Sequence, residues 1–140
     1  MRSFEILIGV NELQANLRQP HWSVVDCRFS LADPAHGRRQ YDAGHIPGAS
    51  YADLDQDLAG PVTATSGRHP LPDPSLFAQT LGRWGIGNKS QVVVYDDAGG
   101  AIAARLWWLL KWCGHKRVAV LDGGFQAWAA SQPLTTEAPP

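Results

Sequence analysis

Two aspartates and two glycines stand together in residues 92–105, VVVYDDAGGAIAAR, where their spacing could support anion chemistry. The valines predict a buried strand, the glycines a tight loop, and the following residues the start of a helix. Such a loop turns several backbone N–H groups toward one point, where they can hold an anion. Loops of this kind often carry a Cys or Ser nucleophile where the strand ends, but here Asp96 and Asp97 occupy that place. The segment therefore combines an anion-binding loop with carboxylates, which repel anions.

The cysteines and histidines offer little other chemistry. Cys27 follows a predicted strand and precedes Arg28, which could lower the pKa of its thiol, but a small buried apolar residue is the simpler interpretation. Cys113 falls in the last turn of a predicted helix, and two cysteines do not make a disulfide framework. The five histidines are scattered without a metal-binding spacing. We therefore expect no metal and no cofactor.

The elements around the aspartate loop alternate between strand and helix. Apolar, β-branched runs predict strands at 23–27, 91–96 and 117–122. Helical spacing and capping residues predict helices at 73–84, 101–114 and 123–131, with two more helical stretches at 9–17 and 37–44. This alternation is typical of an α/β fold with a mainly parallel sheet.

Composition and length limit the class of protein. The 140 residues suit one domain, and 44% hydrophobic with 18% charged residues is ordinary for a globular chain. A net charge of -1 gives no reason to expect nucleic acid or an anionic membrane as a partner. The apolar start is too short for a signal peptide, and the run 101–113 is too short to span a membrane. We expect a cytoplasmic protein.

Three segments suggest contact with something beyond one isolated domain. The Gly- and Pro-rich residues 59–74 predict an unusually long loop, and long loops are commonly functional. The helix at 101–114 carries three tryptophans and only two charges, so it is covered either by another domain or subunit, or by loops of its own domain. The Pro-rich residues 131–140 resemble an interdomain linker.

Several motifs in this order resemble a rhodanese homology domain. They are VVDCRF at 24–29, GHIPGA at 44–49, the YDDAGG loop and LDGGFQAW at 121–128, and the resemblance covers residues 4–130. It implies a three-layer α/β/α fold with a five-stranded, mainly parallel sheet. Active members of this family carry sulfane sulfur as a persulfide on a Cys at the end of the fourth strand.

Asp96 stands at the position of that nucleophile, and Asp cannot form a persulfide. The resemblance therefore implies a degenerate active-site loop, formed by Asp96, Asp97, Ala98, Gly99, Gly100 and Ala101. We expect the Asp96 carboxylate to occupy the anion site, bonded to N–H groups within 98–101; the alternative is that it points out toward a domain that this chain does not contain. A phosphatase related to this fold is disfavoured because the loop has no Cys.

Degenerate loops of this kind are found in the N-terminal half of tandem-domain thiosulfate or 3-mercaptopyruvate sulfurtransferases. The resemblance then implies a rhodanese-like domain at 1–130, a linker at 131–140, and a catalytic C-terminal rhodanese domain of the same polypeptide as partner. Small anionic sulfur donors would bind to that full enzyme, and this chain alone would be inactive. The alternative is a stand-alone inactive module for protein interaction or anion sensing.

Five residues are candidates for supporting the site. Arg28, with Asp26, is expected to hold the strand end to the GHIPGA turn, and His45 to tie the backbone of that turn. Phe29 could form part of an apolar wall facing the partner domain. Arg105 could pair with Asp96 or Asp97, or could be solvated.

Overall fold

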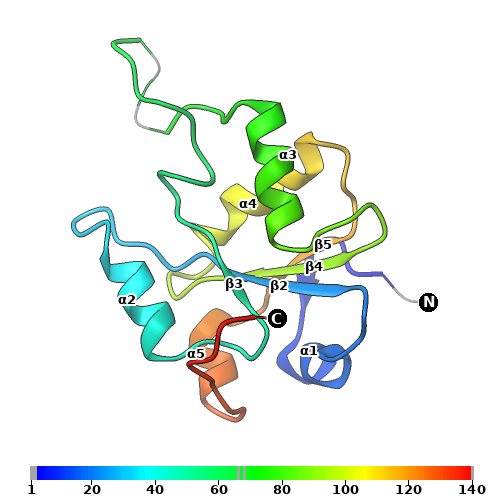
Figure 1. The fold of residues 1–140 in the computed structure, drawn as a ribbon. Helices are drawn as coiled ribbons and strands as arrows, with labels where there is room; N and C mark the ends of the chain where they lie inside the picture. The colour runs from blue at the N-terminus through cyan, green and yellow to red at the C-terminus, as the bar shows by residue number, and fades with distance from the viewer. Residues whose placement is uncertain (1–2, 66, 68, 140) are drawn as a thin grey trace.

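Five parallel strands form one sheet across the middle of the computed structural model (Figure 1). Their order is β1-β5-β4-β2-β3, with β1 at Leu7–Ile8, β2 at Trp22–Asp26, β3 at Ser50–Tyr51, β4 at Gln91–Tyr95 and β5 at Val118–Leu121. The structure describes residues 3–65, 67 and 69–139, so the first two residues of the predicted domain and the last residue of the predicted linker lie outside it. The α/β class and the five-stranded sheet are confirmed, and every strand pairing is parallel.

The central strand β4 shows why these apolar runs become buried strands. Successive side chains of a strand point to opposite faces. Val92 and Val94 accordingly join one hydrophobic core, while Val93 and Tyr95 join the other. All five residues of β4 are buried, which explains its continuous rather than alternating apolar pattern.

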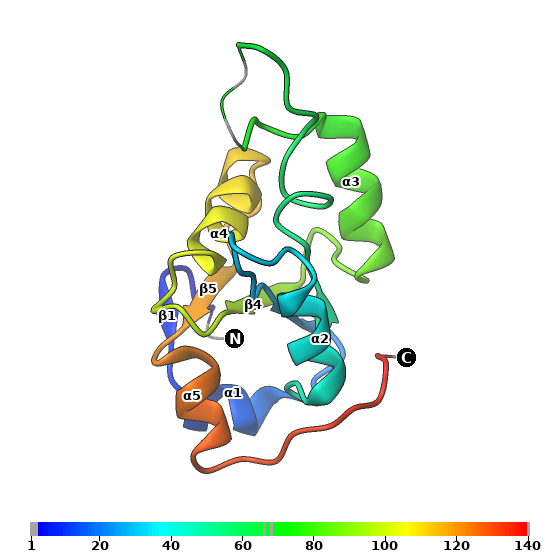
Figure 2. The same cartoon turned by 90° about the vertical axis from the view of Figure 1, so that its left-hand side faces the viewer.

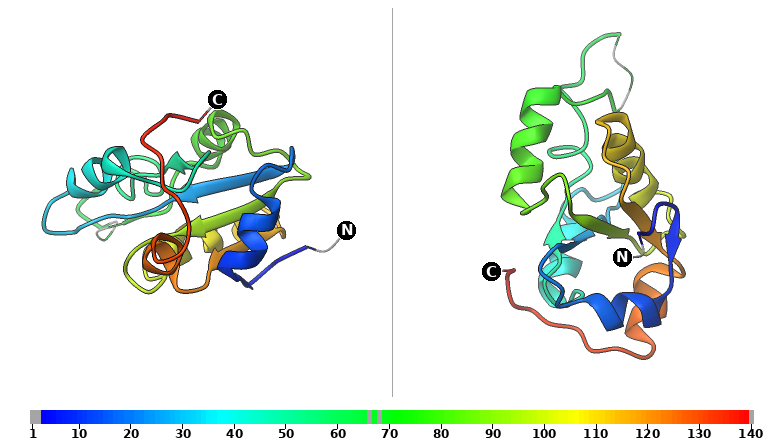
Figure 3. Two further views of the ribbon diagram at one scale, coloured as in Figure 1. Left: turned by 90° about the horizontal axis from the view of Figure 1, so that it is seen from below. Right: turned by 90° about the vertical axis from the view of Figure 1, so that its right-hand side faces the viewer.

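Helices cover both faces of the sheet and complete three layers (Figures 2 and 3). One face packs against α3, Pro74–Arg83, and α4, Ala103–Trp112. The other packs against α1, Val10–Asn16, α2, His36–Ala43, and α5, Gly124–Ala129. The expected cap of α3 is present, because the Asp73 carboxylate accepts hydrogen bonds from the N–H groups of Ser75 and Leu76 at 2.8 and 3.2 Å.

Helix α4 is covered on one side only. Its buried residues are Ala103, Leu106, Leu109 and Leu110, whereas Trp108 and Trp112 stack on one another at the surface, 46% and 41% exposed. The alternative that loops of its own domain bury this helix therefore fails at Trp108 and Trp112, which those loops leave exposed. The alternative, a second domain or subunit over the tryptophans, stays a prediction.

The residues expected to form a linker lie against the domain. We call residues 131–139 the strap. It leaves the end of α5 and runs past the end of α2, as Figure 3 shows from below. Within the described ranges, no helix has both the length and the apolar character needed to cross a membrane.

Candidate functional site

The aspartate loop lies at the carboxyl end of the central strand, between β4 and α4. This edge is where open α/β sheets commonly bind ligands. Gly99 and Gly100 adopt left-handed φ angles of 69° and 91°, which side chains rarely tolerate. The glycines thus let the backbone fold back on itself and direct its N–H groups inward.

Four backbone N–H groups converge on the carboxylate of Asp96. Oδ1 accepts from Ala98 and Gly100, both at 2.9 Å, and Oδ2 accepts from Ile102 at 2.8 Å and Ala103 at 2.7 Å. The side chain is buried, and nothing in this arrangement leaves the anion site for another molecule. Asp96 therefore points inward and fills the site itself.

The donors differ in part from those expected at 98–101. Two of them, Ile102 and Ala103, belong to the following helical turn, which is why α4 begins at Ala103 rather than at the predicted Ala101. The N–H of Ala101 instead donates to the carbonyl of Ala98 at 3.3 Å. Asp97 is exposed, and its carbonyl accepts a hydrogen bond from Gln126. The two neighbouring aspartates therefore have different roles.

The LDGGF segment closes the loop from the other side. The Phe125 N–H donates to the carbonyl of Asp96 at 2.9 Å. A Cβ on Gly124 would lie 2.5 Å from that same carbonyl oxygen, and Gly124 has a φ of +61°. Only glycine fits this close approach, so the two motifs are parts of one site.

Arg28 ties the β2 end to the GHIPGA turn, as predicted. Its guanidinium pairs with Asp26 at 2.7 Å and donates to the Gly44 carbonyl at 2.7 Å, and it lies 4.0 Å from the ring centre of Phe125. Burial, together with the Asp26 charge, raises the pKa of Tyr95, so its hydroxyl keeps the proton that it donates to Asp26 at 2.7 Å. With Arg28 only 2% exposed, this network supports the fold rather than contacting solvent or substrate.

Arg105 supports the long loop instead of the aspartates. Its guanidinium donates to the carbonyls of Leu58, His69 and Pro70 at 3.0, 3.1 and 2.9 Å. Partial burial lowers its pKa. Neither expected arrangement is present: Arg105 forms no ion pair with the loop aspartates, and it is not a solvated arginine. Its side chain instead holds the two ends of the long loop together.

The remaining candidate residues are buried or unactivated. Phe29 is 8% exposed and belongs to the hydrophobic core beneath α3 and α4, so it offers little area to a partner. Burial, followed by the charges of Asp26 and Asp96, raises the pKa of the fully buried Cys27 thiol. Cys113 is exposed, and partial burial raises the pKa of its thiol. Neither thiol has the lowered pKa of a reactive cysteine.

Sequence reasoning missed a histidine–carboxylate pair at the base of the long loop. His69 Nε2 lies 3.0 Å from Asp55 Oδ1, in an arrangement that orients an imidazole for proton transfer. The residues are 14 positions apart, so spacing gave no hint. The length of the 59–74 loop was the only signal.

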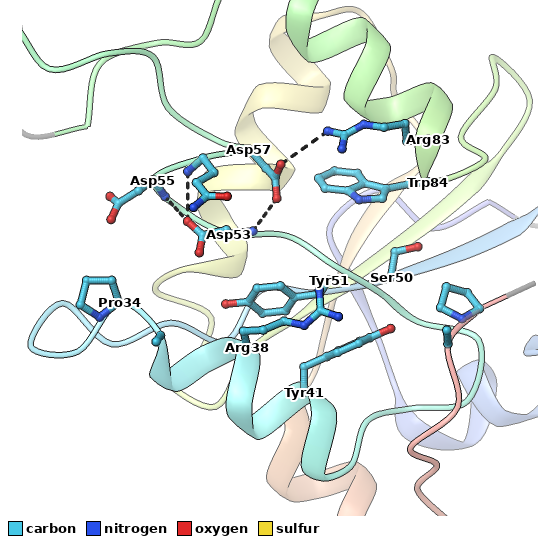
Figure 4. Close-up of a pocket in the computed structure, with 14 residues that line it drawn as sticks. Pro34, Arg38, Tyr41, Ser50, Tyr51, Asp53, Asp55, Asp57, Arg83 and Trp84 are labelled. Carbon is cyan, nitrogen blue, oxygen red and sulfur yellow. Dashed lines mark hydrogen bonds and ion pairs between the residues drawn. The ribbon is translucent and has the colours of Figure 1, made fainter.

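Asp55 of this pair lines a cavity of about 720 Å³, shown in Figure 4, whereas His69 is not among its lining residues. Tyr51 and Trp84 face each other across it, with Arg38 beside Tyr51. Asp57 lies on the same wall as Asp55, and burial raises its pKa. The strap reaches the rim of the cavity through Ala138 and Pro139.

The α/β fold and the aspartate loop together indicate which protein family the chain belongs to. The chain matches the rhodanese-like domain family over residues 9–131 and belongs to it.

Among individual relatives, a probable 3-mercaptopyruvate sulfurtransferase of Pseudomonas aeruginosa is 52% identical over 127 residues, which are 89% of this chain and 45% of the relative. A mitochondrial thiosulfate/3-mercaptopyruvate sulfurtransferase of Arabidopsis thaliana is 40% identical, over 91% of this chain and 33% of that protein. The solved 3-mercaptopyruvate sulfurtransferase of Leishmania major superimposes with a TM-score of 0.85 at 34% identity, over 97% of this chain and 37% of that one. The chain thus spans less than half the length of these relatives.

Proposed function

We propose that this chain is the non-catalytic N-terminal half of a thiosulfate or 3-mercaptopyruvate sulfurtransferase. The observation that carries the proposal is the Asp96 carboxylate, which stands where active members carry their nucleophile and takes up four N–H donors. The relatives named as sulfurtransferases support it, since each is more than twice as long as the matched region. A catalytic rhodanese domain of the same polypeptide would supply the cysteine.

In such an enzyme, the catalytic cysteine accepts sulfane sulfur from an anionic donor and passes it to a thiophile. The Asp96 loop cannot take part in this step, because a carboxylate forms no persulfide and repels an anionic donor. The role of this half would then be to cover the catalytic domain and shape the cleft. The exposed Trp108–Trp112 pair is the apolar surface that we assign to that contact. The cytoplasmic location expected from the sequence is part of this proposal.

The His69–Asp55 pair is the polar group that this half would bring to the cleft. Two observations support this assignment. His69 Nε2 lies close to Asp55 Oδ1, and Arg105 binds the His69 carbonyl at the base of the long loop. In the full-length protein, His69→Gln should reduce turnover more than the surface change His21→Gln. Equal turnover in the two variants would remove the pair from the proposal without affecting the assignment of Asp96.

The test of the main proposal is a thiosulfate–cyanide and 3-mercaptopyruvate assay of the 140-residue chain. We expect no turnover above the uncatalysed rate. Turnover that disappears in Cys27→Ser would contradict the proposal. Asp96→Cys in the same chain tests the loop separately, because a cysteine held by the same N–H groups should be alkylated faster than a free thiol at neutral pH.

A stand-alone binding module is the second candidate. The observation in its favour is that the described residues form a hydrophobic core on each face of the sheet. The coding sequence beyond codon 140 discriminates between the two. A second GHIPGA-like turn with a Cys-bearing loop supports the enzyme, and a stop codon supports the module.

A further inference from the structure

Two loops meet at the end of the sheet where β4 and β5 begin, opposite the end that carries the Asp96 loop (Figure 1). One loop, residues 84–90, joins α3 to β4, and the other, residues 113–117, joins α4 to β5. Residues of both loops, together with Leu81 of α3, line a cavity of about 400 Å³. We call this cavity the basic pocket. Its volume falls in the range of small-molecule sites.

The charged side chains that line the basic pocket are both cations. They are Lys116 and Arg117, and no Asp or Glu is among the lining residues. Residues 74–95 and 98–121, which hold α3, α4, β4, β5 and both loops, contain no Asp or Glu. Within the described ranges, neither Lys116 nor Arg117 forms an ion pair with a carboxylate. A pocket lined by unpaired charges of one sign attracts a ligand of the opposite sign.

Hydrogen bonds hold the two loops against each other. His115 Nε2 lies 2.8 Å from the Ser90 carbonyl oxygen, and the Arg117 guanidinium donates to the Lys89 carbonyl at 3.4 Å. Within the first loop, the Gly87 N–H donates to the Ser90 hydroxyl at 2.9 Å. The walls of the basic pocket are therefore in place before a ligand binds, which lowers the entropic cost of binding.

The basic pocket also has an apolar side. Leu81 and Ile86 are half-buried and pack on the hydrophobic core beneath α3 and α4. The planar guanidinium of Arg117 and the ammonium of Lys116 suit a carboxylate, sulfonate or phosphate group. A ligand that matches both sides of the pocket combines one such acidic group with a compact apolar body.

We propose that the basic pocket is a binding site for a small organic anion, which pairs its acidic group with Lys116 and Arg117 and rests its apolar body on Leu81 and Ile86. The proposal goes beyond the sulfurtransferase assignment and does not depend on it. The exposed Cys113 lines the same pocket, so a bound ligand shields its thiol from solvent.

The test titrates the ¹⁵N-labelled 140-residue chain with benzoate and with benzamide, which has the same ring but no charge. Benzoate should give saturable shifts of the amide signals of residues 86–88 and 113–117. Because it gains two ion pairs that benzamide lacks, it should bind about tenfold more tightly. Benzoate should also slow the alkylation of Cys113 by uncharged iodoacetamide. Equal affinities for the two compounds, or shifts that do not saturate, would overturn the proposal.

Two variants distinguish a site from a general attraction of anions to the protein. Lys116→Gln removes one charge from the basic pocket and keeps the backbone carbonyl that accepts a hydrogen bond from Lys111. It should weaken benzoate binding about threefold, since an exposed ion pair contributes modestly. Arg18→Gln is the matched control, because it removes an exposed cation outside the pocket and should leave the affinity unchanged. Equal affinities of the two variants for benzoate would contradict the site.

Discussion

Replacing Asp96 tests whether its carboxylate now stabilises the loop that would hold an anion in an active relative. Asp96→Ala removes the acceptor for four N–H groups. Ala98 is exposed, and Gly100 and Ile102 are half-buried, so water can replace the carboxylate at these three donors. The Ala103 N–H is buried, so this donor loses its partner outright.

An unsatisfied buried donor costs about 1–3 kcal/mol, so the change should lower the free energy of unfolding by at least about 1–3 kcal/mol. That is a large share of the roughly 5–15 kcal/mol typical of a domain. Asp96→Asn should be comparably harmful, because its amide NH₂ would face N–H donors. The measurement is the urea midpoint followed by tryptophan fluorescence at constant m-value.

Asp97→Ala is the control, since an exposed neighbour should change stability by less than about 0.5 kcal/mol. Sulfate or thiosulfate should then stabilise Asp96→Ala more than Asp97→Ala, because an anion can enter the emptied loop. A midpoint for Asp96→Ala equal to that of Asp97→Ala would refute the reasoning, since the four contacts would then contribute nothing.

Four further outcomes follow from the same structure. Arg28→Lys should cost about 2–4 kcal/mol in urea unfolding, because an ammonium cannot serve Asp26 and a carbonyl with the same planar geometry; a cost below 0.5 kcal/mol, of order a surface change, would contradict the network. In native protein, a thiol reagent should label exposed Cys113 but not buried Cys27, unless urea is added. Because folding raises the pKa of Cys27, stability should decline as the pH rises above its unfolded value of about 8.5, and Cys27→Ala should flatten that decline. Gly124→Ala should lower the thermal midpoint far more than an alanine at solvent-exposed Gly82 does, because its Cβ meets a backbone carbonyl at 2.5 Å; equal midpoints would show that the carbonyl can move away.

The sequence alone predicted correctly those strands and site residues that depend on a local pattern of residues. The three apolar runs gave β2, β4 and β5 with small errors at their ends, because strands covered on both faces must be apolar throughout. The inward carboxylate of Asp96 also followed from the loop alone, since a strand, two glycines and a helix start leave N–H groups that need an acceptor. Asp26 and Arg28 were placed correctly because both sit at one strand end.

Contacts between distant segments could not be anticipated. Strand β1 is only Leu7–Ile8, and its strand character comes from pairing with β5 more than a hundred residues later. The role of Arg105 depends on the path of the long loop, which returns two carbonyls to the same guanidinium. No local propensity encodes that path.

In the aspartate loop, a side chain of the protein itself takes the place that a bound anion could occupy. The N–H groups at a strand–loop–helix junction need a negative acceptor whether or not a substrate arrives, because leaving them unpaired in a protein interior is costly. In Asp96 the chain supplies that acceptor covalently, so the junction is satisfied without a ligand. Under the proposed function, the aspartate that stands in place of a nucleophile also stabilises the fold, and a cysteine at this position would give up that stabilisation. The LDGGF segment contacts this filled loop, and the GHIPGA turn contacts the Arg28 network, so both motifs are held by the fold itself.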